Sequence, residues 1–291
     1  MLETVAFGGA AALIWGATAL TSAPASRLAG PWRAMFWMSL AATAATALVA
    51  LSTGLPAGSA SDWTLVAVAG LAYTASTACW LSTVRGGDIS LVTPIIACDG
   101  AIAALLAVVA GESLSALAAA ALAAMVLAVL LIAREEAAPP VASEVRFRVT
   151  VERSTRKTVF LAFLTALFFA IVFFTSGKIH SISPLWVVAA ARTIPCVYAF
   201  LICAREGSLV PPSGTWRWII PCGVSDAAAY VCFIYASHGP LAVAAVLASQ
   251  YAAVAAVGGV LLLGERLLRR QWIGIATLIL AAGVIASQGG G

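Results

Sequence analysis

The stretch Ala116-Leu-Ala-Ala-Ala-Ala-Leu-Ala-Ala-Met-Val-Leu-Ala-Val-Leu-Leu-Ile-Ala133 decides the fold class of this chain. It contains no charged side chain and no regular alternation of apolar and polar residues. A helix needs ~20 mostly apolar residues to cross a bilayer, whereas the strands of a membrane barrel alternate in character. The stretch therefore predicts a membrane-spanning helix and argues against a barrel.

The composition of the whole chain also indicates a membrane protein. Of its 291 residues, 62% are hydrophobic and only 10% are charged, whereas a soluble domain is typically ~45–50% apolar and ~25% charged. Ten apolar stretches are long enough to span a bilayer: 4–23, 33–52, 63–83, 89–110, 113–133, 158–177, 184–204, 216–237, 240–262 and 271–287. We therefore expect an all-α membrane protein with ten transmembrane helices, a multi-pass protein of the cytoplasmic (inner) membrane.

One long basic connection, at 134–157, divides the chain into two halves of five spans each, 1–133 and 158–291. Of the 16 Lys and Arg residues, only Lys178 and Arg192 lie outside the odd-numbered connections, which leaves 14 on those connections. Lys and Arg are enriched in cytoplasmic loops. The charges therefore predict that the odd-numbered connections face the cytoplasm and that both chain ends face outward.

The two halves share a short sequence pattern. In the first half, Gly87-Asp-Ile-Ser-Leu-Val-Thr-Pro-Ile-Ile leads to Gly111-Glu112; in the second, Gly239-Pro-Leu-Ala-Val-Ala-Ala-Val-Leu leads to Gly264-Glu265, 153 positions after the first pair. We expect each glutamate to cap the helix that follows it, because a carboxylate is stabilised at a helix N-terminus. Because five spans is an odd number, the pattern predicts two inverted five-helix repeats, which are typical of secondary transporters.

Two further motifs carry a resemblance to a known family. They are Ala12-Leu-Ile-Trp-Gly-Ala-Thr18 and, after Gly264-Glu-Arg-Leu and a short basic loop, Gln271-Trp-Ile-Gly-Ile-Ala-Thr-Leu-Ile-Leu-Ala-Ala-Gly-Val-Ile285. In their order and spacing, these motifs resemble EamA-type members of the drug/metabolite transporter (DMT) superfamily. The resemblance implies an EamA/DMT-like fold of ten helices in two repeats, with 1–133 and 158–291 as the repeats. It also implies export or uptake of amino acids, metabolites or drugs.

Three ionisable residues lie inside predicted spans: Asp99, Arg192 and Asp226. Such residues cost ~2.5–3.5 kcal/mol at the bilayer centre on insertion scales, so they face protein or water and are functional candidates. The alternative is a structural ion pair between Arg192 and one aspartate. Two acids and one arginine leave a surplus acid, which could take a proton or a cationic group, and a zwitterion could place its carboxylate on Arg192.

Aromatic and polar residues extend this candidate site. With the repeat spacing of 153, Asp226 corresponds to Tyr73 in the first half. Thr77 and Trp80 follow Tyr73 by four and seven positions, and Tyr230 and Phe233 follow Asp226 in the same way, so each trio shares one helix face. Ring faces on these two helices could hold an organic cation. Besides the three ionisable residues, the predicted substrate-binding residues are Tyr73, Thr77, Trp80, Tyr230, Phe233, Gln250, Tyr251 and Trp15. Ordinary helix packing is the alternative for each of them.

These features favour a secondary transporter that moves a small organic solute, an amino acid or a related cationic or zwitterionic metabolite, by alternating access, with export as the expected direction. The alternatives are a flippase for lipids or lipid-linked substrates and a non-transporting membrane scaffold. No GxxxxGK[ST], HExxH or GxSxG motif occurs, so we expect no enzyme activity, cofactor or metal. The expected partners are the solute, the lipid bilayer and a proton as candidate coupling ion. Nucleic acid is not expected, and the protein is expected to be a monomer or homodimer.

Overall fold

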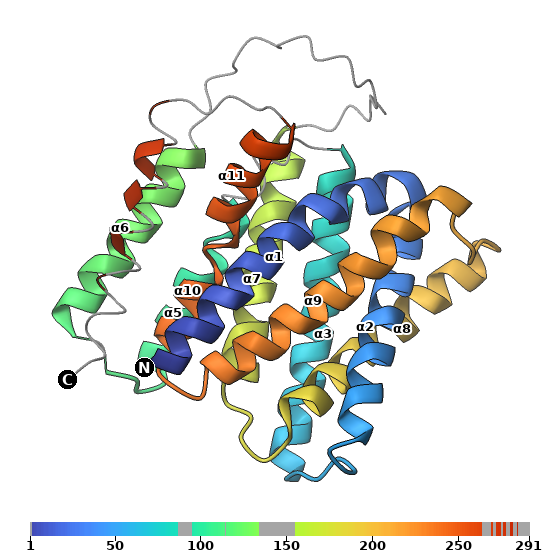
Figure 1. Cartoon of the computed structure of the whole chain (residues 1–291), viewed down its shortest axis with the longest axis horizontal. Helices are drawn as coiled ribbons and strands as arrows, with labels where there is room; N and C mark the ends of the chain where they lie inside the picture. Colours follow the sequence, from blue (N-terminus) through green and yellow to red (C-terminus); the bar gives the residue numbers. More distant parts are fainter. Residues whose placement is uncertain are drawn as a thin grey trace.

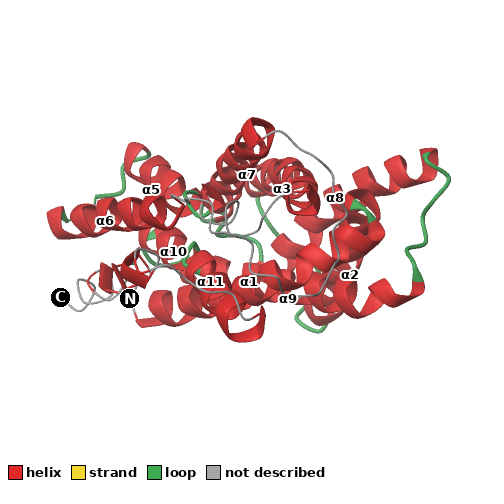
Figure 2. Ribbon diagram, turned by 90° about the horizontal axis from the view of Figure 1, so that it is seen from above, coloured by secondary structure: helices red, strands yellow, loops and turns green. Residues whose placement is uncertain are grey.

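The structure is a computed structural model that describes residues 2–86, 95–113, 115–133, 155–263 and isolated positions between 269 and 284. Over these residues the secondary structure is helical, as Figures 1 and 2 show. The helices are α1 (Leu2–Ala29), α2 (Pro31–Leu51), α3 (Ala60–Gly86), α5 (Asp99–Val109), α6 (Ala116–Ala133), α7 (Thr155–Ser176), α8 (Pro184–Arg205), the 3₁₀ helix η1 (Ser213–Thr215), α9 (Trp216–Ala236), α10 (Leu241–Ala248) and α11 (Tyr251–Leu263).

Six helices in the described part of the chain are long and apolar enough to cross a bilayer, namely α1, α2, α3, α7, α8 and α9. Two shorter apolar helical segments, Asp99–Val109 and Leu241–Ala255, lie within the fourth and ninth predicted spans. The helical class is confirmed, whereas the total of ten spans stays a prediction. Most of the predicted linker at 134–157 lies outside the described residues, and of the tenth span only isolated positions are described.

Local sequence explains where two of the long helices begin. Both α2 and α8 start with a proline, Pro31 and Pro184. Proline suits the first helical position because its backbone angle already matches the helix and its missing N–H would have no partner there. Gly30, with φ of 83°, makes the tight turn from α1 into α2. A residue with a side chain rarely adopts that angle.

The main helix contacts run between the two halves of the chain. Helix α2 packs against α8, α1 against α9, α3 against α7, and α5 against α10. Figure 2 shows α3 beside α7, while α6 lies at one end of the molecule in both views. Many residues on these contacts are alanines with no exposed surface, among them Ala11, Ala191 and Ala229. Small residues allow membrane helices to approach closely, so the core of the protein is the seam between its halves.

Glycines mark the closest approaches across this seam. A Cβ atom on Gly223 of α9 would overlap the backbone carbonyl of Met38 in α2. A Cβ atom on Gly100 of α5 would overlap the backbone carbonyl of Ala245 in α10, as well as the Ser249 side chain. Backbone atoms cannot move aside as a flexible side chain can. These positions therefore require glycine for a packing reason.

The ninth predicted span, 240–262, is interrupted. A turn at Ser249–Gln250 separates α10 from α11, and the Gln250 N–H bonds the Leu247 carbonyl three residues back at 3.1 Å. A matching turn at Ala97–Cys98 precedes α5, where the Cys98 N–H bonds the Ile95 carbonyl at 3.3 Å. The two turns lie 249 − 97 = 152 positions apart. Both halves therefore contain a break at corresponding places, which the apolar run alone did not reveal.

Glu112 joins the two halves at one end of the broken segments. Its carboxylate accepts hydrogen bonds from the Ala242 N–H, at 3.2 Å to Oε1 and 3.4 Å to Oε2. The sequence led us to expect a cap on the helix that follows Glu112. The carboxylate instead caps α10 of the other half. Glu265, its counterpart in the repeat, lies outside the described residues.

We predict that Gly223→Ala lowers the free energy of unfolding by ~1–3 kcal/mol, the usual cost of overpacking. The reason is that the added methyl group forces α9 away from the backbone of α2. Gly9→Ala in α1 is the control, because a Cβ there meets nothing within 4 Å. It should leave stability unchanged or raise it by up to ~1 kcal/mol. Denaturant unfolding of the purified variants in detergent measures both, and equal effects would contradict the packing argument.

Candidate functional site

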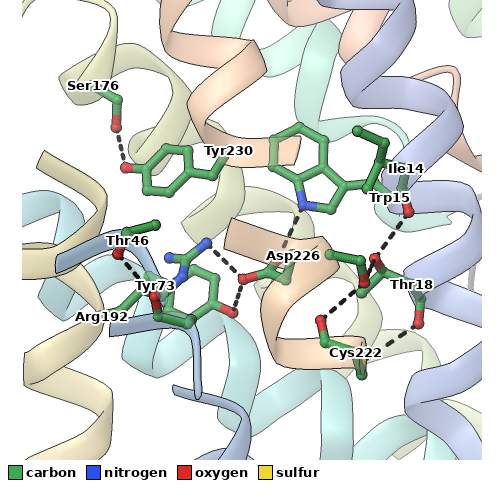
Figure 3. Close-up of polar contacts among 12 residues, drawn as sticks. Ile14, Trp15, Thr18, Thr46, Tyr73, Ser176, Arg192, Cys222, Asp226 and Tyr230 are labelled. Atoms are coloured by element: carbon green, nitrogen blue, oxygen red, sulfur yellow. Dashed lines mark hydrogen bonds and ion pairs between the residues drawn. The ribbon is translucent and has the colours of Figure 1, made fainter. Parts of the chain in front are cut away.

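Asp226, on α9, is the centre of a polar cluster that joins four helices (Figure 3). Its Oδ1 accepts a hydrogen bond from the indole N–H of Trp15 on α1, at 3.0 Å. Its Oδ2 accepts one from the hydroxyl of Tyr73 on α3 at 2.9 Å, and lies 2.8 Å from an amino nitrogen of Arg192 on α8. The carboxylate therefore has a cation and two neutral donors, the surroundings that a buried charge requires.

Arg192 is held by aromatic rings as well as by Asp226. Its guanidinium carbon lies 3.2 Å from the centroid of the Tyr73 ring and 4.5 Å from that of the Tyr230 ring. Such cation–π contacts gain strength when they are removed from water, and Arg192 is only 1% exposed. The Tyr230 hydroxyl shares a hydrogen bond with Ser176 on α7. The structural ion pair considered for Arg192 is therefore present, and its partner is Asp226.

Asp99 is the surplus acid. It begins α5, is 1% exposed, and accepts from the Gly100 N–H at 2.6 Å and from the Tyr251 hydroxyl at 3.4 Å. Among the described residues, the pair of Arg192 with Asp226 is the one salt bridge found within 4.0 Å. Asp99 thus has two neutral donors, one of them distant, and no cationic partner in the part of the chain that the structure describes.

A cavity lies between the two halves and holds both aspartates. It contains about 580 Å³ of empty space, a figure that includes the open space at its mouth. Its walls are formed by Trp15, Thr18, Ala19, Ser22, Met38, Tyr73, Thr77, Trp80, Ile96, Asp99, Phe169, Phe173, Asp226 and Tyr251. The structure therefore brings together seven of the predicted site residues: Trp15, Tyr73, Thr77, Trp80, Asp99, Asp226 and Tyr251.

The other four predicted residues do not line this cavity. Arg192 and Tyr230 lie behind Asp226, with no more than 1% of each exposed. Phe233 is fully buried and stacks on Phe173, with ring centroids 4.4 Å apart. The Gln250 side-chain N–H bonds the Val246 carbonyl at 2.9 Å within the turn between α10 and α11. These residues support the wall from behind or shape a helix break.

The sequence reasoning missed several wall residues. Thr18, Ala19 and Ser22 lie three, four and seven positions after Trp15, so they share its helix face. That spacing could have identified them. Phe169 and Phe173 on α7 follow an i, i+4 spacing of the same kind. They look like ordinary core residues because phenylalanine is frequent throughout that span.

No metal centre is indicated by the described side chains. They contain no group of three or more His, Cys, Asp or Glu residues that could hold an ion. The six cysteines are all free, and they lie apart on several helices.

The fold and the site together define a multi-pass helical membrane protein with a mainly apolar cavity, which contains two aspartates, at the seam of its halves. The model of the EamA-like transporter family matches residues 4–134 and 156–287, and the chain belongs to this family. A solved structure described as "Crystal structure of protein" matches with a TM-score of 0.78 over 98% of this chain and 99% of that chain, at 14% identity. That likeness shows a shared fold. Among curated protein sequences, no match was found.

We predict that Asp226→Asn lowers the free energy of unfolding by ~3–5 kcal/mol, because it leaves the Arg192 charge buried and unpaired. Asp99→Asn, which removes a charge that has no cationic partner, should leave the free energy of unfolding unchanged or raise it. Replacing both Arg192 and Asp226 by neutral residues of similar size should recover much of the loss. Unfolding in detergent compares the variants, and an equal cost for the two Asn substitutions would show that Asp99 is also paired.

Proposed function

We propose that this member of the EamA-like family is a secondary transporter, which carries a small organic solute across the cytoplasmic membrane by alternating access. The observation that carries the proposal is the cavity between the halves. Its polar groups, Asp99 and Asp226, are deep in the protein, and its walls come from helices of both halves. Ionisable residues are tolerated at such depth where they line a solute or ion pathway.

The helix contacts support the inverted-repeat part of this proposal. We take 1–133 and 158–291 as the two repeats, so that α1 corresponds to α7, α2 to α8, and α3 to α9. If the two repeats are related by symmetry, each contact of α1 with α9 should have a counterpart between α7 and α3. Both contacts are present. The α2–α8 contact is converted into itself. This pattern favours two like bundles related by a two-fold axis, and with five spans each they would be inverted.

The paired helix breaks support alternating access. The turns at Ala97–Cys98 and Ser249–Gln250 occupy corresponding places in the two halves, and each is followed directly by a cavity residue, Asp99 or Tyr251. Interrupted helices at matching positions are typical of binding sites in transporters with inverted repeats. We propose that rocking of the halves about this seam exposes the cavity to one side at a time. We further propose that the protein exports the solute and that a proton is the coupling ion.

Filling the cavity should stop transport without unfolding the protein. Ala19 lies in the cavity wall on α1, and we predict that Ala19→Phe lowers the transport rate at least about tenfold, by occupying the space where solute binds. Ala44→Phe on the exposed side of α2 is the matched control and should transport at the normal rate.

The solute for this test comes from thermal stabilisation of the purified protein against a metabolite library. Its movement is then measured by counterflow in proteoliposomes, with a melting curve to confirm that each variant is folded. A folded Ala19→Phe protein with normal counterflow would place the pathway elsewhere. A stabilising solute that never crosses the membrane would contradict the transporter function itself.

A further inference from the structure

Two acid–tyrosine pairs cross the seam between the halves, and both line the cavity. In one pair, Tyr73 of the first half donates to Asp226 of the second, 153 positions later. In the other, Tyr251 of the second half donates to Asp99 of the first, 152 positions earlier. The spacing matches the 153 between the two Gly-Glu motifs. The cavity therefore contains two similar acid–tyrosine sites, which we call half-sites. Each half of the chain supplies the aspartate at one of them and the tyrosine at the other.

The two half-sites differ in charge compensation. The Asp226 half-site already contains a cation, the guanidinium of Arg192, which lies over the ring of its tyrosine. The Asp99 half-site contains no such group within the described chain. An ionised carboxylate that is removed from water requires a counter-charge, because weak neutral donors do not replace its hydration. The protein supplies that counter-charge to Asp226. At Asp99, a cation that enters the cavity would have to supply it.

We propose that Asp99 binds the ammonium group of a monocationic organic solute, which takes the place that Arg192 takes beside Asp226. This inference rests on the proposed function and names its substrate class: organic amines with one positive charge and an apolar body. The Arg192–Asp226 pair within the protein is then the same kind of cation–carboxylate contact as the one that the solute makes with Asp99.

The cavity offers little to an anionic or zwitterionic solute. None of the residues in its wall is Lys or Arg. Arg192 is buried behind Asp226 and paired with it through Nη2, whereas its Nε and Nη1 have no hydrogen-bond partner among the described residues and do not reach the wall. Most wall hydroxyls are bonded within the protein, as those of Thr18 and Ser22 are. A carboxylate would therefore be buried beside Asp99 and Asp226 without a cation, which is unfavourable.

One wall hydroxyl lacks a hydrogen bond of normal geometry. The Thr77 hydroxyl, on the same face of α3 as Tyr73, is buried and makes no hydrogen bond of normal geometry among the described residues. Buried polar atoms in proteins are nearly always satisfied. Thr77 is part of the cavity wall and, within the described chain, its hydroxyl interacts only with the nearby Tyr73 hydroxyl, so it is able to accept from an ammonium group of a solute as well as to donate.

The aromatic wall suits the apolar body of such an amine. The indole N–H groups of Trp15 and Trp80 are already used, by Asp226 and by the Ser22 hydroxyl. What these side chains offer to a solute is therefore the ring surface. Phe169 and Phe173 add two more rings to the same wall. Aromatic faces attract organic cations and pack against apolar groups.

Three compounds that share an indole ring and differ in charge test this inference: tryptamine (cation), tryptophan (zwitterion) and indole-3-propionate (anion). Binding of each to the purified full-length protein is measured by thermal shift and titration calorimetry at neutral pH. We expect tryptamine to bind most tightly, by at least about tenfold over the other two, because a charge-assisted hydrogen bond is worth about that factor or more.

Substitutions at the Asp99 half-site test whether binding depends on the charge of the site or only on its shape. Asp99→Asn should weaken tryptamine binding at least about tenfold. Tyr251→Phe should change it less than about threefold, because the 3.4 Å hydrogen bond that it removes is long and weak. Glu206→Gln, an acid-to-amide change at an exposed position after α8, is the matched control and should have no effect.

The outcomes distinguish this inference from the proposed function. Preferred binding of tryptophan or indole-3-propionate, no binding of tryptamine, or equal tryptamine binding by the Asp99→Asn protein would overturn the amine assignment. A library solute could still be transported in each of those cases. Tryptamine binding that depends on Asp99, in a protein that moves no solute in counterflow, would support the amine site and contradict transport.

Discussion

The buried ion pair between Arg192 and Asp226 is the interaction on which the rest of the structure depends. It lies where α1, α3, α8 and α9 meet, in a protein whose exterior faces lipid. Arg192 is almost completely buried there, so its charge depends on Asp226. Two aromatic rings lie against Arg192, and an indole and a hydroxyl donate to Asp226, while Nε and Nη1 of Arg192 have no hydrogen-bond partner among the described residues. The pair therefore fixes the relative positions of helices from both halves. It also neutralises Asp226, so that Asp99 is the carboxylate of the cavity wall without a cationic partner in the described chain.

The second constraint is the close packing of the two halves. Lipid provides no hydrophobic force that drives one membrane helix onto another, so small residues and shape determine which helices meet. Alanines and the glycines at positions 100 and 223 bring the backbones of the two halves into contact. The helix breaks, the acid–tyrosine pairs and the cavity all lie along this seam. A motion of one half against the other therefore acts directly on the site.

Prediction from sequence succeeded where the physical signal is local. The apolar runs located α1, α2, α3, α7, α8 and α9 closely, because the thickness of the bilayer sets the length of a span. The repeat spacing of 153 matched Asp226 with Tyr73, and the two are bonded in the structure. Prediction failed for the break at Ser249–Gln250, because a continuous apolar run fits a straight helix and a broken one equally well. It also failed for Glu112, whose partner Ala242 is in the other half.

The sequence by itself determined that the chain is a helical membrane protein of the EamA-like family and that three ionisable residues lie deep within it, because composition and span length are properties of short segments. The tertiary structure alone decided which aspartate is neutralised. Asp99 and Asp226 are alike as residues in apolar spans, and the difference between them is the distance to Arg192. That distance depends on how the two halves pack, which no single segment encodes.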